Sequence, residues 1–261
     1  MANRNYKVFI VEGESREPQI IDNISKIFFS HGNSIVITLP AGENIYMLWR
    51  QLKEDDFETD IIEVLRDNNA YVKKKLSGLS RNDFSEIYLF FDYDVHHENL
   101  KKDDNSDVVY QMLENFDNET DNGKLFISYP MVEALRDFQP RKCGNGIDCF
   151  VQISDMVRYK YISSNRSHNP HFKDYDINVW KDIVGVFIMR LSCLYGLADV
   201  MSYDVYSNEV RPCDIYGMEV NKIKRDGVFI LSAFPEFLLD YFGVRLWKTC
   251  AKQQKFCNCK R

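Results

Sequence analysis

The sequence lacks the bulk positive charge of proteins that bind nucleic acid by electrostatics alone. Its 33 lysine and arginine residues are outnumbered by 39 aspartate and glutamate residues, which gives a net charge of −6. Short basic runs such as Lys73-Lys74-Lys75 are typical of solvated surface, and no basic tail or stripe accompanies them. Any contact with a polyanion is therefore expected to be local or assisted by a metal ion.

Several motifs of common enzyme classes are also missing. No Gly-x-x-x-x-Gly-Lys-Ser/Thr loop is present, so ATP hydrolysis is not expected of this chain. Neither a Gly-x-Ser-x-Gly elbow nor a Cys-His nucleophile arrangement stands out. The seven cysteines are irregularly spaced, and Cys257 and Cys259 lack a second ligand pair at zinc spacing. This cysteine usage, without a signal-peptide pattern, predicts a reducing cytoplasmic location.

No apolar run is long enough to predict a membrane span. The longest, residues 183–198, contains Arg190 and is better explained as a buried helix. We therefore expect no membrane partner.

The order of apolar segments predicts an α/β fold, with a largely parallel sheet flanked by helices. Strands are expected at residues 7–11, 34–39, 87–91 and 125–128, and helix-period segments lie between them. We assign residues 1–142 to this domain, with a helical insertion at about 45–82 in which 60–76 forms one helix. Residues 143–261 are predicted to be mainly helical. Residues 163–174 are the most linker-like stretch.

Acidic residues follow two of the predicted buried strands. Glu12 comes directly after residues 7–11, and Asp92 and Asp94 follow residues 87–91. Open α/β sheets bind their ligands at the C-terminal ends of the strands, and crowded carboxylates need protons or cations to neutralise them. Hard oxygen ligands favour Mg²⁺ or Mn²⁺. The alternative is that these acids only initiate turns or cap helices.

The stretches "VFIVEGESRE" and "IYLFFDYD" resemble the TOPRIM fold of topoisomerases, primases and OLD-type nucleases. The resemblance covers residues 5 to 140 and implies that Glu12, Asp92 and Asp94 bind the catalytic metal ion. "SYPMVEALRD" is similar to the Pro-x-x-Glu helix entry of TOPRIM-like defence proteins, which makes Glu133 a further catalytic candidate. The sequence departs from the family where "VHHEN", and not glycine, follows Asp-x-Asp.

The size and the helical C-terminal portion most resemble the small TOPRIM effectors of the PARIS anti-phage system. That resemblance implies a regulated toxin, restrained by a separate ABC-type ATPase, that cleaves RNA such as transfer RNA, or DNA. Arg16, Glu17 and His96 are candidates for substrate binding, because residues that follow a strand end line the same crevice. A homodimer is expected only because two-fold dimers are the commonest oligomers.

Two other functions remain compatible with the sequence. The first is a catalytically inactive TOPRIM scaffold used for protein binding or signalling, in which the acids act as caps. The second is primase-like nucleotide transfer, for which the sequence offers no added domain.

Overall fold

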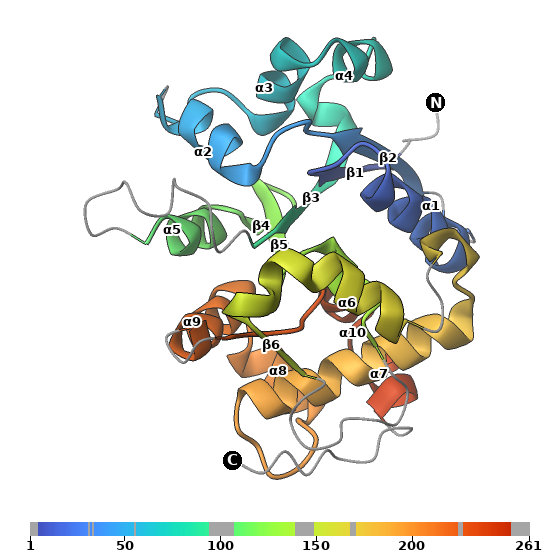
Figure 1. The fold of residues 1–261 in the computed structure, drawn as a ribbon. Helices are drawn as coiled ribbons and strands as arrows, with labels where there is room; N and C mark the ends of the chain where they lie inside the picture. The colour runs from blue at the N-terminus through green and yellow to red at the C-terminus, as the bar shows by residue number, and fades with distance from the viewer. Residues whose placement is uncertain are drawn as a thin grey trace. The chain divides into compact units, whose positions relative to one another are not determined.

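The fold is α/β, with a central, mostly parallel sheet of five strands that is flanked by helices (Figure 1). The computed structural model describes residues 5–30, 32, 34–54, 56–93, 107–138, 149–167, 171–223 and 227–251. The chain divides into two compact units, one of residues 1–91 and 96–125 and the other of residues 92–95 and 126–261. The predicted boundary after residue 142 lies outside the described residues.

The strands of the sheet follow the order β2-β1-β3-β5-β4. Their bounds are β1 (Asn5–Val11), β2 (Ser34–Pro40), β3 (Phe84–Asp92), β4 (Asp117–Asn118) and β5 (Gly123–Ser128). β1 pairs in parallel with both β2 and β3, whereas β4 and β5 are antiparallel. β1 therefore lies inside the sheet, and β2 forms one of its outer edges.

β1 is buried on both faces, as expected of a strand covered by helices. Val8 to Val11 have no exposed surface, and the ring of Phe9 stacks on Phe90 of β3 with centroids 5.8 Å apart and planes 5° apart. Lys7 is also buried, and its charge is neutralised by an ion pair with Glu86 of β3. A buried charge is tolerated where such a partner accompanies it.

Helices of the first unit surround this sheet. They are α1 (Arg16–Phe28), α2 (Ile45–Glu54), α3 (Ile61–Asn68), α4 (Ala70–Lys75), the 3₁₀ turn η1 (Arg81–Asp83) and α5 (Val108–Asn115). α1 lies against β1 and β2, and its inward face carries the fully buried side chains of Ile20, Ile21 and Ile24 (Figure 1). The spacing of these isoleucines is that of an amphipathic helix.

The prediction of one helix over residues 60–76 was wrong, because Asn69 separates α3 from α4. Its backbone is extended, with φ −131° and ψ 109°. Its side-chain oxygen accepts hydrogen bonds from the backbone N–H groups of Tyr71 and Val72, at 2.9 and 3.3 Å. An asparagine that caps in this way begins a new helix. The apolar residues keep helical spacing on both sides of Asn69, so the sequence pattern does not reveal the break.

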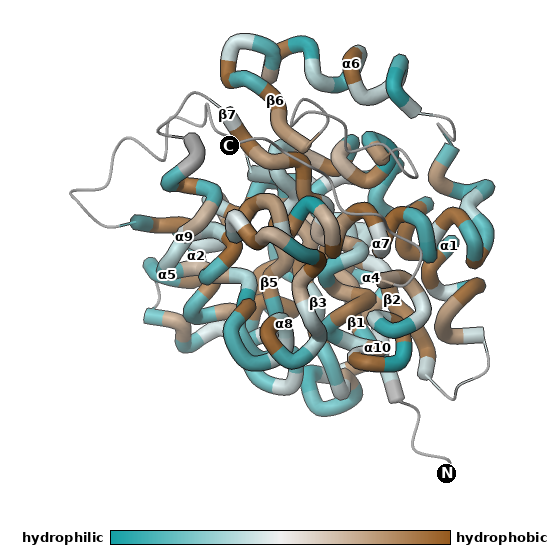
Figure 2. Tube along the Cα trace, turned by 90° about the horizontal axis from the view of Figure 1, so that it is seen from below, coloured by the Kyte–Doolittle hydropathy of each residue, from teal (hydrophilic) through white to brown (hydrophobic). Residues whose placement is uncertain are grey.

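The second unit is mainly helical but also contains a small antiparallel sheet of β6 and β7. Its elements are η3 (Val132–Leu135), β6 (Phe150–Gln152), η4 (Ile153–Arg158), α6 (Tyr159–Arg166), η5 (Phe172–Asp174), α7 (Ile177–Leu194), α8 (Tyr203–Glu209), α9 (Pro212–Ile223), β7 (Gly227–Phe229) and α10 (Ala233–Ala251). α7 and α10 pack against each other and form the core of this unit. In Figure 2, β7 has hydrophobic colours, whereas much of α6 has hydrophilic ones.

Two local predictions in this region were wrong. Pro130 does not begin an α-helix, because Met131 after it is extended and only the 3₁₀ turn η3 follows. The linker-like residues 163–174 include the last turn of α6 and all of η5.

Arg190 is buried in α7 because polar groups of the same unit surround it. One of its terminal nitrogens donates to the carbonyl oxygen of Ile230 at 3.1 Å, and the other lies 3.9 Å from the carboxylate of Asp137. Asp137 also accepts a hydrogen bond from the hydroxyl of Tyr159 at 3.1 Å and lies 3.6 Å from Arg166. Burial and the charge of Asp137 together raise the pKa of Tyr159 well above its usual value.

Among the described residues, no helix is long and apolar enough to span a bilayer.

Candidate metal centre and adjoining pocket

The two central parallel strands each lead into an acidic residue. β1 and β3 pair in register as far as Val11 and Phe90. Glu12 follows β1 directly, and Asp92 is the last residue of β3. Both side chains are half-buried. Glu12 is assigned to the first unit and Asp92 to the second, and each by itself stands at the C-terminal end of a parallel strand, the position from which α/β sheets bind ligands.

The other predicted metal ligand, Asp94, lies outside the described residues, as does His96. Within the part of the chain that the structure describes, no three His, Cys, Asp or Glu side chains gather as metal ligands. The two acids that are described, Glu12 and Asp92, offer the hard carboxylate oxygens that suit Mg²⁺ or Mn²⁺. Their donor chemistry therefore fits the ion that the sequence predicts.

The turn between β1 and α1 is closed by Glu17. This residue is only 8% exposed, and its carboxylate accepts a hydrogen bond from the backbone N–H of Gly13 at 3.3 Å. A Cβ atom at position 13 would lie 2.8 Å from that carboxylate, so a larger residue there would displace the Glu17 side chain. Arg16 is exposed at the start of α1. Glu17 therefore shapes the loop that carries Glu12, and a direct role of either residue with substrate remains a prediction.

Glu133 lies in η3 of the second unit and has no exposed surface. Two more acids of that unit, Glu219 and Glu236, are also buried. Glu219 accepts a hydrogen bond from the backbone N–H of Phe229 at 3.1 Å. Burial, followed by the charges of Glu236 and Glu219, raises the pKa of Tyr129 well above its usual value. Sequence analysis missed Glu219 and Glu236, because each is a single acid within an apolar helix pattern.

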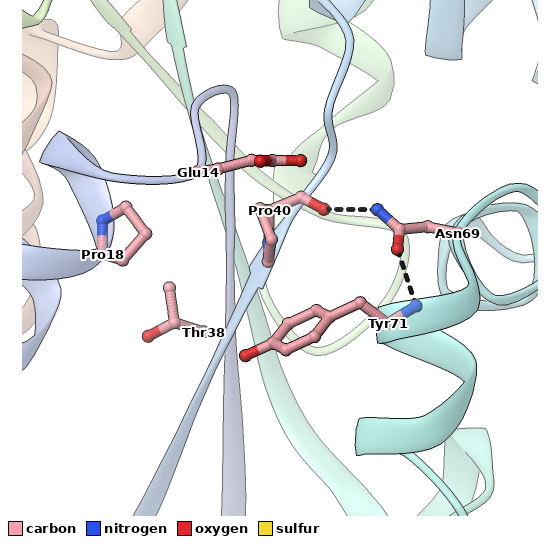
Figure 3. Close-up of a pocket in the computed structure, with 6 residues that line it drawn as sticks. All are labelled: Glu14, Pro18, Thr38, Pro40, Asn69 and Tyr71. Carbon is pink, nitrogen blue, oxygen red and sulfur yellow. Dashed lines mark hydrogen bonds between the residues drawn. The ribbon is translucent and has the colours of Figure 1, made fainter.

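A pocket of about 360 Å³ opens beside the β1–α1 turn in the first unit. It is lined by residues of the turn, of α1, of β2, of α4 and of the cap before α4, and these residues are Glu14, Pro18, Thr38, Pro40, Asn69 and Tyr71 (Figure 3). In Figure 3, Glu14 lies on one side of Pro40 and the ring of Tyr71 on the other.

Two hydrogen bonds hold the far wall of this pocket. The side-chain amide of Asn69 donates to the carbonyl oxygen of Pro40 at 3.5 Å, and the ammonium group of Lys75 donates to the hydroxyl of Tyr71 at 3.3 Å. The same ammonium group lies 5.4 Å from the centre of the Tyr71 ring. The ring is therefore held in place, although 56% of the residue's surface is exposed.

The loop after β2 joins the pocket to Glu12. The backbone N–H of Gly42 donates to the carbonyl oxygen of Glu12 at 3.3 Å. Gly42 has a φ of +74°, and a Cβ atom there would lie 3.8 Å from the amide of Asn69 and 4.0 Å from the carboxylate of Glu14. A glycine suits this backbone conformation and leaves the space between those two side chains open.

Searches against protein-family models, curated proteins and solved structures found no match to this chain.

Proposed function

We propose that this chain is a metal-dependent nuclease of TOPRIM type, which hydrolyses phosphodiester bonds of nucleic acid with Mg²⁺ or Mn²⁺. The observation that carries the proposal is the parallel pairing of β1 and β3, because Glu12 directly follows β1 and Asp92 is the last residue of β3. Both side chains offer the hard carboxylate oxygens that Mg²⁺ and Mn²⁺ prefer, at the strand ends where α/β sheets bind ligands. The resemblance of the surrounding segments to TOPRIM sequences supports the same assignment.

Glu12, Asp92 and Asp94 would hold the ion through their carboxylate oxygens. When bound, the ion supplies polarisation of the phosphate and stabilisation of the leaving oxygen. Glu12 would either ligate a second ion or accept a proton from the attacking water. The turn closed by Glu17 and Gly13 would fix the direction of the Glu12 side chain.

The biological setting rests on the resemblance to PARIS effectors. It assigns to this chain a toxin role in anti-phage defence, an ABC-type ATPase as its restraining partner, and RNA, including transfer RNA, or DNA as substrate. Co-expression with the neighbouring ATPase and a phage trigger, followed by sequencing of RNA and DNA ends, tests this setting. Discrete ends that depend on the trigger support it, and intact nucleic acid contradicts it.

The direct test compares Glu12→Gln and Asp92→Asn with Glu54→Gln, a substitution of an exposed acid at the end of α2. We expect the first two variants to lose cleavage by at least about 100-fold, because acid–base and metal-assisted steps contribute on that scale. The control should keep full activity, and all three should keep the wild-type melting temperature. Wild-type cleavage should stop in EDTA and return with Mn²⁺.

Full cleavage by the Glu12→Gln and Asp92→Asn variants would contradict the nuclease assignment. If wild-type protein shows no cleavage and binds no Mn²⁺ in calorimetry, the scaffold alternative replaces it. Glu133→Gln belongs in the same series, because Glu133 is fully buried. A lower melting temperature with retained activity would assign Glu133 to stability, and the reverse would support its predicted catalytic role.

A further inference from the structure

We propose that the pocket beside the β1–α1 turn binds one guanine nucleotide of a single-stranded substrate, with the base between Glu14 and the ring of Tyr71. The inference rests on the proposed nuclease function for the identity of that strand as substrate. The binding site itself is carried by features of the first unit alone. These features are its volume, its flat walls, its hydrogen-bonding groups and the charges around it.

The size and walls of the pocket suit a base. A volume of about 360 Å³ falls at the small end of ligand pockets, which span about 300–1,000 Å³. Pro18, Pro40 and Tyr71 give it three flat or apolar surfaces. The Tyr71 ring is exposed but held by Lys75, so little side-chain freedom is lost when a base stacks on it. Unstacked bases of single strands commonly pack on such aromatic side chains.

Glu14 decides which base fits. Within the described residues it forms no hydrogen bond or ion pair, and it is exposed at the pocket. The amide of Asn69, in contrast, is already used by Pro40 and by the first turn of α4. An ionised carboxylate only accepts hydrogen bonds. A ligand edge with two adjacent donors would pair with both of its oxygens.

Guanine is the base that meets this requirement. Its N1–H and N2–H₂ groups are adjacent donors on one edge, and they match the two oxygens of the Glu14 carboxylate. Adenine and cytosine place a ring acceptor beside their amino group, and uracil flanks its single N–H with two carbonyl oxygens. These acceptors would face a carboxylate oxygen without a proton between them.

The charges of α4 suit the phosphates of the same nucleotide. Lys73, Lys74 and Lys75 are all exposed. Lys74 and Lys75 lie three and four residues after Tyr71, which is the spacing that places side chains on one face of a helix. A base stacked on Tyr71 would therefore have cations near its sugar–phosphate chain. In this arrangement the lysines of α4, which the sequence alone indicates are ordinary surface residues, would bind the phosphates of the nucleotide.

The pocket also lies close in the chain to the proposed metal centre. Glu14 follows Glu12 by two residues, and the N–H of Gly42 holds the carbonyl oxygen of Glu12. A nucleotide bound in the pocket would position its strand relative to the loop that carries Glu12. The expected consequence is cleavage at a fixed distance from an unpaired guanine.

Binding is tested on the full chain in EDTA, so that cleavage plays no part. The probes are the four 5′-nucleoside monophosphates and RNA hexamers of adenine with or without one central guanine, titrated by calorimetry. We expect GMP to bind at least about tenfold more tightly than the other monophosphates, since two good hydrogen bonds give discrimination of that size. The guanine hexamer should bind more tightly than GMP, because it adds phosphate contacts.

Variants separate the two recognition groups. Glu14→Gln should abolish the preference for guanine, while Tyr71→Ala should weaken binding of every base by about tenfold and Tyr71→Phe should retain it. Tyr110→Ala and Glu114→Gln remove an exposed aromatic residue and an exposed acid from α5 and should change nothing. A wild-type protein without preference for GMP, or a Glu14→Gln variant that keeps it, overturns the proposal.

Different experimental outcomes would contradict the nuclease proposal and the pocket proposal. If GMP and the guanine hexamer bind equally, the ligand is a free nucleotide and the single-strand assignment is overturned. If guanine binding survives in Glu12→Gln but no condition gives cleavage, the nuclease proposal fails and the pocket remains. If cleavage depends on Glu12 but not on Glu14 or on guanine in the substrate, the pocket assignment fails and the nuclease remains.

Discussion

The ammonium group of Lys75 donates a hydrogen bond to the backbone carbonyl oxygen of Thr38 at 2.7 Å. Asn69 forms a similar bond with Pro40, two residues further along β2. Since β2 is an outer strand, these contacts satisfy backbone oxygens that no neighbouring strand can reach. They also fix the position of α4, and with it one wall of the pocket.

Asn69→Ala should lower the free energy of unfolding by about 1–2 kcal/mol, because it removes the cap of α4. The lost bonds are those from the N–H groups of Tyr71 and Val72 and the bond to Pro40. Asn68→Ala is the matched control, since Asn68 is exposed and its side chain donates a hydrogen bond to the side chain of Gln51. Its effect should stay within about 0.5 kcal/mol in urea unfolding. Equal effects of the two substitutions would show that Asn69 is not a cap.

Gly227→Ala should destabilise the second unit by about 1–3 kcal/mol, as overpacking of a filled site does. A Cβ atom at position 227 of β7 would overlap the ring of Phe150 on β6. In a Phe150→Ala background the same substitution should cost almost nothing, because the ring is gone. Thermal unfolding of the four proteins measures this coupling. An unchanged cost in the Phe150→Ala background would contradict the close approach of the two strands.

Asp137→Ala should lower the free energy of unfolding by about 3–5 kcal/mol, because it leaves the charge of Arg190 buried without its carboxylate. Asp137 and Arg190 are 2% and 5% exposed. Asp155→Ala is the control, since Asp155 pairs with the exposed Arg158 and such surface pairs contribute about 0–1 kcal/mol. Denaturant titration compares the two. A small effect at Asp137 would mean that the arginine needs no counter-charge there.

The contribution of Asp83 to stability should depend on pH. Its carboxylate accepts hydrogen bonds from the backbone N–H and the hydroxyl of Ser80, at 2.7 and 2.9 Å, and these bonds lower its pKa, with the backbone bond as the larger cause. A lowered pKa means that the ionised form stabilises the fold above the unfolded-state pKa of about 4, and that this stabilisation is lost as pH falls through the folded-state pKa. Wild-type protein should therefore exceed Asp83→Asn in melting temperature at pH 7.

The difference between those two proteins should begin to shrink as the pH falls through the unfolded-state pKa of about 4, and it should disappear only below the lowered folded-state pKa, where Asp83 is neutral in both states. Scanning calorimetry at matched ionic strength measures it. A difference that grows on acidification would show that the bonds to Ser80 favour the protonated acid.

The alternation of apolar runs allowed the central strands to be predicted, since burial on both faces requires continuous hydrophobic residues such as Val8 to Val11. It also allowed Glu12 and Asp92 to be assigned to strand ends. The break at Asn69 could not be predicted, because the apolar residues on either side keep helical spacing. A capping asparagine and an asparagine on a helix surface look alike in a sequence.

The burial of charged side chains could not be predicted either, for a different reason. Lys7 and Arg190 are accommodated by Glu86 and Asp137, which are distant in the chain and become partners only through tertiary packing. The pocket has the same origin, since its walls come from a turn, a strand and two helices. The pattern of residue types along a sequence does not reveal such tertiary contacts.

The separation of α3 from α4 at Asn69 has a thermodynamic consequence. A helix of six residues gains little stability from its own backbone hydrogen bonds. The folded conformation of α4 therefore depends on its contacts with β2, such as the hydrogen bond from Lys75 to Thr38. A molecule bound against Tyr71 would add to those attachments, and by linkage its occupancy would make opening of this segment rarer. Slower deuterium uptake by the amides of residues 70–75 would then report that the pocket is filled, even where no part of the backbone changes position.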